Sequence, residues 1–166
     1  GFGDTNFDFS AISSTIEDIH FSFCTTDANG GLANIPMGVG STAADDRIRM
    51  AFDASTNNYY ADMWSNAAVA GRVLVSSMGA PAGHYLATRY NDSAAFIYLD
   101  GVQMALNSTT VDVSDVPSDT FYIGAANVAG VAAGFTTKTF GLATIGKYMT
   151  GTDITAFQTI TDKFLT

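Results

Sequence analysis

The chain has few of the residues that build disulfides, cysteine-based metal sites or helical bundles. Its 166 residues include one cysteine, Cys24, which excludes an internal disulfide and a zinc site made of cysteines. Glu17 is the one glutamate and lysine is scarce, and because both residue types are common in helices, this argues against a bundle. No apolar run approaches the roughly 18 residues of a membrane-spanning helix.

Basic residues are scarce as well. Seven Lys and Arg stand against 16 Asp and Glu, which gives a formal net charge of −9. Such a chain is poorly suited to a phosphate backbone or an anionic membrane surface, so we expect no nucleic-acid partner and no membrane insertion. The same balance favours a neutral glycan over a strongly anionic one. The first residue is Gly1 rather than Met, so we expect residues 1–166 to be a single domain of a longer or processed protein.

Alternating apolar and polar residues predict a series of β-strands. Residues 19–24 and 47–53 show the pattern most clearly, since every second side chain is apolar. A period of two places one face of a strand on a core and the other toward water. Further strands are expected at 59–64, 72–78, 84–90, 94–100, 102–106, 121–124 and 139–145.

Turn and helix signals complete the expected fold. Asp100-Gly101 stands between two apolar runs and predicts a tight hairpin, because both turn residues must adopt positive φ. Segments 38–43 and 125–134 are rich in glycine and are expected to be a turn and a loop. One helix is predicted near the C-terminus, with Thr152 as its cap and Asp153 at the positive end of its dipole. Its apolar face is expected to comprise Ile154, Phe157, Ile160 and Phe164.

The second half of the chain contains an ordered series of short motifs. His84 and Arg89 bracket one strand, and FIYLDG at 96–101, FYIG at 121–124 and YMTGTDI at 148–154 follow. In this order the motifs resemble the concanavalin A-like lectin/glucanase superfamily, in its laminin-G-like branch. The resemblance implies an all-β antiparallel jelly-roll β-sandwich, here with one short C-terminal helix. That fold carries lectins, glycosidases, adhesion modules and virion domains, so it implies little about function.

A candidate carbohydrate-binding segment lies at 57–64. Sugars require a flat apolar ring to stack on and fixed polar groups for their hydroxyls. The candidate residues are Asn57, Asn58, Tyr60, Asp62 and Trp64. The two aromatic rings would stack on the sugar, and the amides and the carboxylate would bond its hydroxyls. The alternative is that Tyr59 and Met63 face the core and the other aromatic residues cover a sheet edge.

A candidate calcium site begins at Asp27 and Asn29. The spacing is that of the start of a Ca²⁺ loop, but the closing glutamate is missing, so the segment is not an EF-hand. The laminin-G-like resemblance implies a Ca²⁺ ion at a sheet rim, bound by an Asp and backbone carbonyls. An ordinary Asx turn is the alternative.

The sequence departs from the catalytic pattern of the superfamily's hydrolases. Those enzymes carry Glu-x-Asp-x-(x)-Glu along one strand, and here Ile19 stands where the Asp should follow Glu17. We therefore expect a domain that is not an enzyme.

The composition is rich in Thr, Ala and Gly and resembles phage tail-fibre, spike and capsid-decoration domains. We predict an extracellular, virion-surface adhesion domain that binds a cell-surface glycan and other virion proteins. Segment 125–134 would pack between the protomers of a homotrimer. A purely structural virion domain and a glycoside hydrolase that uses loop aspartates are the alternatives.

Overall fold

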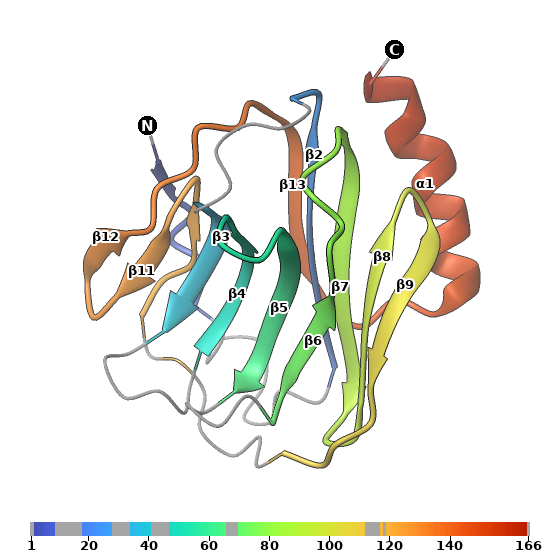
Figure 1. Ribbon diagram of the computed structural model, residues 1–166, viewed down its shortest axis with the longest axis horizontal. Coiled ribbons are helices and arrows are strands. Elements are labelled where there is room, and N and C mark those ends of the chain that lie inside the picture. The colour runs from blue at the N-terminus through green and yellow to red at the C-terminus, as the bar shows by residue number, and fades with distance from the viewer. Residues whose placement is uncertain are drawn as a thin grey trace.

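The computed structural model describes residues 2–8, 18–27, 34–40, 47–65, 70–111, 117 and 119–165, and these form a β-sandwich with one helix (Figure 1). One sheet contains β1 (Gly3–Asp4), β3 (Asn34–Gly40), β4 (Arg47–Asp53), β5 (Asn58–Ser65), β6 (Arg72–Val75), β10 (Tyr122–Ile123), β11 (Ala126–Val128) and β12 (Val131–Ala133). The other contains β2 (Ile19–Thr25), β7 (Gly83–Asn91), β8 (Ala94–Leu99), β9 (Val102–Asn107) and β13 (Phe140–Gly146). The helix, α1, spans Gly151–Leu165.

The two sheets have a continuous strand order. The first runs β1-β10-β3-β4-β5-β6, and the second runs β13-β2-β7-β8-β9. Neighbouring strands are antiparallel except for β11, which pairs with β3 in parallel. The predicted antiparallel sandwich with a C-terminal helix is therefore confirmed, with one parallel pair added.

The core lies between the sheets and is built by the apolar face of each alternating strand. Tyr85 of β7 is fully buried at its centre, where it stacks on Phe23 with 4.9 Å between ring centroids. Phe52 and Tyr59 of the opposite sheet meet the same ring edge-on at 5.4 and 5.0 Å. Because aromatic pairs contribute about 0.5–1.5 kcal/mol beyond their buried area, this cluster helps to hold the sheets together.

Most of the predicted strands are confirmed, and so is the hairpin. Asp100 and Gly101 join β8 to β9 with φ of 50° and 75°. The strand at Arg72 is shorter than predicted and ends at Val75, and the strand predicted at 121–124 is reduced to two residues.

The two glycine-rich segments differ from prediction. Gly38 and Gly40 belong to β3, so the expected turn at 38–43 is wrong for its described part, while 41–43 lie outside the described residues. Segment 125–134 is not a loop but contains the β11–β12 hairpin, with Ala129 and Gly130 at positive φ in its turn. Pairing with β3 and β12 overrides the weak strand propensity of these small residues.

Helix α1 covers the outer face of the five-stranded sheet, as Figure 1 shows. Cys24 of β2 and Leu86 of β7 point to that face and are fully buried, so the prediction that the second face of the 19–24 strand meets water is wrong. The cap is Thr150 rather than Thr152: its Oγ1 accepts the Asp153 backbone N–H at 3.2 Å, and the Asp153 carboxylate accepts the Thr150 N–H at 2.9 Å.

The buried face of α1 agrees with prediction at Ile154 and differs from it at Ile160, while the side chain of Phe164 lies outside the described part of the structure. Ile154, Gln158 and Thr161 are buried, whereas Ile160 is 52% exposed. The sheet face beneath the helix includes polar groups. The polar residues Gln158 and Thr161 are therefore buried against it, and the predicted Ile160 is not. No helix in the described part of the chain is long and apolar enough to cross a membrane.

Candidate functional site

Five side chains gather on the open face of β4, β5 and β6, the face turned away from the core. We call them the arginine cluster: Arg47, Arg49, Tyr60, Asp62 and Arg72. Strand alternation places them there, because Ile48, Met50 and Ala61 between them are buried in the core. The register pairs Arg49 with Asp62 and Asp62 with Arg72, so three adjacent strands contribute one row of side chains.

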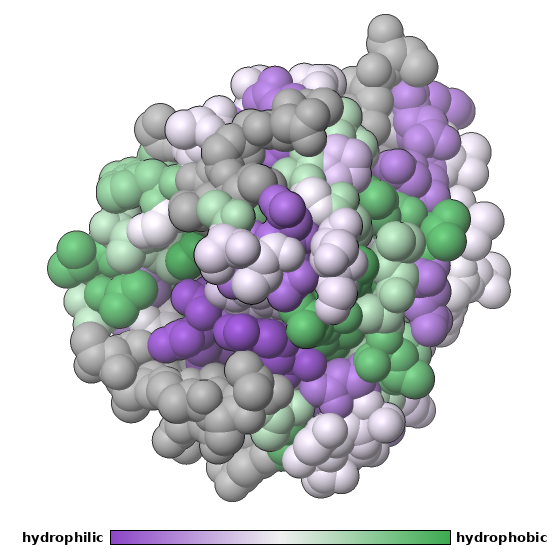
Figure 2. All heavy atoms as spheres, viewed as in Figure 1, coloured by the Kyte–Doolittle hydropathy of each residue, from purple (hydrophilic) through white to green (hydrophobic). Residues whose placement is uncertain are grey.

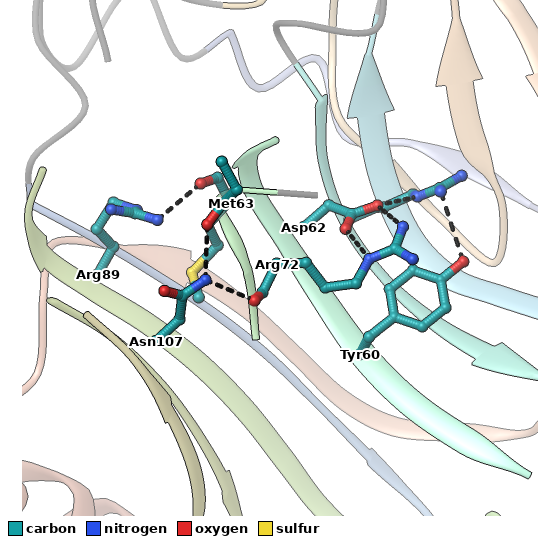
Figure 3. Close-up of polar contacts among 8 residues, drawn as sticks. Tyr60, Asp62, Met63, Arg72, Arg89 and Asn107 are labelled. Atoms are coloured by element: carbon teal, nitrogen blue, oxygen red, sulfur yellow. Dashed lines mark hydrogen bonds and ion pairs between the residues drawn. The ribbon is translucent and has the colours of Figure 1, made fainter. Parts of the chain in front are cut away.

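Asp62 organises the cluster. Its side chain is fully buried, and both of its oxygens accept hydrogen bonds from arginines. Oδ1 accepts from Arg72 Nε at 2.6 Å, and Oδ2 accepts from Arg72 Nη2 at 2.9 Å and from Arg49 Nε at 2.8 Å (Figure 3). A bidentate arginine–carboxylate pair fixes the plane of the guanidinium, so Asp62 orients both cations.

Tyr60 contacts the same two guanidinium groups, and Arg72 lies the closer to its ring. The Arg72 Cζ lies 3.8 Å from the centroid of the Tyr60 ring, and the Arg49 Cζ lies 5.6 Å from it. Arg49 Nη2 also donates to the Tyr60 hydroxyl at 3.5 Å. Cation–π contact adds about 0.5–2 kcal/mol, so Arg72 is fixed both at its edge and on its face.

The two arginines keep donors for a ligand. Their side chains are 18% and 24% exposed, and within the described part of the chain Nη1 of neither one takes part in the contacts above. Guanidinium N–H groups bond carboxylates and other oxyanions with defined geometry. An arrangement of this kind has the chemistry to bind an oxyanion.

Glycines in β3 make room for the arginines of β4. A Cβ at Gly38 would lie 2.6 Å from the Arg49 Cβ, and one at Gly40 would lie 3.2 Å from the Arg47 Cγ. A side chain at either position would crowd the arginines, which explains why β3 contains glycines beside the site although glycine weakens a strand.

The local charge of this face is opposite to that of the whole chain. The cluster carries three guanidinium groups and one carboxylate, although the protein has a net charge of −9. Burial lowers the pKa of Arg47, and the charge of Arg49 lowers it further. Burial also lowers the pKa of Arg72, but the hydrogen bonds and charge of Asp62 outweigh it and raise the pKa. Figure 2 shows hydrophilic side chains gathered over this part of the sheet.

Cavities adjoin the cluster. One of about 370 Å³ is lined by Asp53, Asn58, Tyr60, Arg72 and Leu74. A second, of about 360 Å³, lies on the side of β4 and the turn that follows it, and it shares Asp53 and Tyr60 with the first. A smaller one of about 50 Å³ lies beside Arg47 and Arg49.

The structure brings only part of the predicted sugar-binding set together. Tyr60 and Asp62 lie in the cluster, but the oxygens of Asp62 bond arginines, so its predicted role toward hydroxyls is wrong. Asn58 lines a cavity while its Oδ1 accepts the Ser77 N–H at 3.0 Å. Asn57 is an exposed turn residue at φ 56°. Trp64 belongs to β5, but its side chain lies outside the described part of the structure.

Other parts of the segment agree with the alternative prediction, since Tyr59 and Met63 face the core and are fully buried. Sequence reasoning missed Arg49, Arg72 and Asp53 as site residues. The alternation of Arg47 and Arg49 with core residues is visible in the sequence, but their meeting with Asp62 depends on the sheet register.

The predicted calcium ligands are only partly described. The Asp27 carboxylate accepts the backbone N–H of Thr139, and its carbonyl accepts from Lys138 Nζ at 2.8 Å. Asn29 lies outside the described residues. Where the structure is described, no three His, Cys, Asp or Glu side chains group to hold a metal ion. Calcium at Asp27 stays a prediction.

Two polar residues, Arg89 and Asn107, have structural roles. Arg89, from the motif that begins at His84, is buried and donates from Nη2 to the Met63 carbonyl at 2.9 Å, which links β7 to β5 (Figure 3). Burial lowers its pKa to about 10. The Asn107 amide donates to the carbonyls of Ala70 and Arg72 at 2.7 Å and so links β9 to β6. Both residues join the five-stranded sheet to the sheet that presents the cluster.

Comparison with known proteins gives likeness in structure rather than in sequence. No protein-family model matches the chain, and no curated protein matches its sequence. The Ruminococcus gnavus IT-sialidase CBM40 superposes with a TM-score of 0.61 at 13% identity, covering 93% of this chain and 92% of that one.

Two larger proteins contain a similar domain. The Streptococcus pneumoniae sialidase NanB superposes with a TM-score of 0.65 at 11% identity, and this chain, 94% covered, spans 27% of that protein. A putative carbohydrate-binding protein of Bacteroides ovatus gives 0.60 at 16% identity, over 85% of this chain and 40% of that one. At these identities the likeness concerns the fold.

Proposed function

We propose that the chain is a non-catalytic carbohydrate-binding domain whose arginine cluster binds the carboxylate of an acidic sugar. Arg49 and Arg72 would donate to the carboxylate oxygens. The Tyr60 ring and the neighbouring cavity would receive the sugar ring, and Asn58 at the cavity wall would contact its hydroxyls. Small-ligand sites commonly combine an apolar wall with a few fixed polar groups in this way.

The observation that carries the proposal is the gathering of three arginines around one buried aspartate in a strongly acidic protein. The arrangement orients guanidinium groups and leaves donors on the open face of the sheet, which suits an anion better than a neutral ligand. The structural neighbours support the choice of anion: complexes of the Ruminococcus gnavus CBM40 with α2,3- and α2,6-sialyllactose are among them, and both are carboxylate-bearing sugars. The proposal therefore replaces the neutral glycan, which we expected from the net charge of the chain, with an acidic one.

The carboxylates beside the cavity are arranged for binding rather than hydrolysis. A glycosidase needs two carboxyl groups about 5–9.5 Å apart, one of which is held protonated. Asp62 accepts three hydrogen bonds from arginines, so it is not placed to give a proton to a sugar oxygen. Hydrogen bonds from Ser55 lower the pKa of Asp53, the opposite of what a general acid needs.

The wider biological setting rests on the sequence alone. We propose an extracellular, virion-surface location with other virion proteins as partners, a homotrimer, and Ca²⁺ bound at Asp27. Their support is the composition and the family resemblance described above.

Isothermal titration calorimetry with α2,3-sialyllactose and lactose tests the proposed function. We expect the wild type to bind sialyllactose and not lactose, and to bind more weakly as salt is raised, since screening weakens exposed charge pairs. Arg49→Ala should weaken binding at least tenfold. The matched control is Lys163→Ala, which removes one positive charge from the exposed side of α1 and should leave binding unchanged. Equal affinity for the two sugars, or equal effects of the two variants, would contradict the proposal.

A further inference from the structure

We infer that the binding face holds two sugar residues, an acidic one on the Arg72 side of Tyr60 and a neutral one on the opposite side. The inference rests on the proposed function and specifies the class of ligand: a carboxylate-bearing sugar joined to a neutral sugar.

The first observation is a pair of cavities of nearly equal size that share a wall. The Arg72 cavity measures about 370 Å³ and its neighbour about 360 Å³, and both are lined by Tyr60 and Asp53. Small-ligand sites span about 300–1,000 Å³, so each cavity lies at the lower end and suits one sugar residue rather than an oligosaccharide. Tyr60 and Asp53 therefore mark a boundary between two subsites.

The second observation is the unequal charge of the two cavities. Arg72 lines the first, whereas no basic side chain lines the second among the described residues. Asp53 borders both, and the Ser55 N–H and hydroxyl donate to its Oδ1 at 2.9 and 2.7 Å, which holds the carboxylate in place. A second carboxylate beside Asp53 would be repelled without compensation, so the acidic residue belongs with Arg72.

The third observation is the apolar lining of the second cavity. Its remaining residues are small or apolar: Ile35, Ala51, Phe52, Ala54, Ser55 and Gly134. A neutral pyranose offers a face of C–H groups to such a surface and hydroxyls to its polar rim at Asp53 and Ser55. Gly134 is at φ 63°, and a Cβ there would lie 2.5 Å from the Ile35 Cδ1, so the wall keeps its shape only with glycine at this position.

A comparison of one- and two-residue probes tests the inference. Calorimetry would use the methyl α-glycoside of N-acetylneuraminic acid, α2,3-sialyllactose and lactose. The wild type should bind sialyllactose at least fivefold more tightly than the methyl glycoside. Ala54→Trp adds a ring to the exposed turn after β4 and fills the second cavity. In this variant the Kd of sialyllactose should rise to that of the methyl glycoside, whose own Kd should change less than twofold.

The control is Ser76→Trp, which adds the same ring to an exposed turn after β6 that lines neither cavity, and it should keep the wild-type preference. Circular dichroism checks folding, and Ala54→Leu replaces the larger variant if that one does not fold. Equal wild-type affinity for the two acidic probes, or a preference that survives filling of the cavity, would overturn the two-residue site while leaving the proposed function in place. Absence of binding to both acidic probes would reject the proposed function itself.

Discussion

Each outer face of the sandwich carries a buried polar side chain, but the two side chains are buried in different ways. On the outer face of the five-stranded sheet, α1 covers His84, whose Nδ1 bonds the Gln158 Oε1 at 2.8 Å. On the open face of the other sheet no helix among the described residues covers Asp62, which is buried by the arginines beside it. The comparison shows that the covering element, rather than the strand pattern, decides which face leaves charged side chains partly exposed.

The covered face should contribute most to stability and nothing to binding. Ile154 of α1 is 1% exposed, and Ile154→Ala should lower the free energy of unfolding by about 2–5 kcal/mol through the cavity it leaves. Urea denaturation measures the change. Ile160→Ala on the 52% exposed side is the matched control, expected within about 0.5 kcal/mol of wild type. A change of sialyllactose affinity in folded Ile154→Ala would contradict the separation of the two faces.

The open face should couple stability to binding through Asp62. Asp62→Asn removes the charge that both arginines bond, and we expect a loss of about 2–4 kcal/mol of stability together with most of the affinity. Denaturation and calorimetry on the same preparation measure both quantities. Full affinity in the folded variant would show that Asp62 does not orient the arginines.

Replacement of Arg72 by lysine separates charge from geometry. Lysine keeps the positive charge but loses the bidentate contact with Asp62 and the flat contact with Tyr60. We expect the Kd for sialyllactose to rise about tenfold, equivalent to about 1.4 kcal/mol. An unchanged Kd would mean that the cluster attracts ligands only by its net charge.

The buried His84 on the helix-covered face should make the stability of the protein depend on pH. Burial lowers the pKa of His84 below 6.5, although Gln158 and the charges of Asp100 and Asp162 act in the opposite direction. The unfolded state therefore binds the proton first, so this contribution to stability is present above pH 6.5 and is lost as the pH falls toward the folded-state pKa. The Nε2 atom is buried and lacks a hydrogen-bond partner in the described part of the chain, which adds to the cost of charging the ring.

Denaturation at pH 7.5 and 5.5 measures this loss. The loss should be smaller in His84→Gln, while His20, whose pKa burial also lowers, retains its own share. An identical loss in the variant and the wild type would exclude His84 as its source.

The sequence predicted most strands because apolar alternation survives in 19–24 and 47–53, and it predicted the hairpin because Asp100-Gly101 suits positive φ. It did not predict β3, since Pro36, Gly38 and Gly40 weaken any strand signal, and the need for small residues beside Arg49 arises only in the sheet.

The same limit applies to the site. The aromatic-rich segment pointed to Tyr60 and Asp62, but their partners lie 13 residues before and 10 residues after Asp62 and meet it only through strand register. The predicted helix face was wrong at Ile160 for a related reason: apolar spacing selects Ile160, whereas the surface beneath α1 includes His84 and accepts Gln158.

The most direct test of the account is a titration of ¹⁵N-labelled protein with α2,3-sialyllactose, followed by amide and arginine Nε–Hε resonances. We expect saturable shifts in β4, β5 and β6, and in the Nε–Hε signals of Arg49 and Arg72, with α1 and β9 unperturbed. Shifts confined to α1 or the five-stranded sheet, or none at millimolar ligand, would contradict the assignment of the open face as the binding surface.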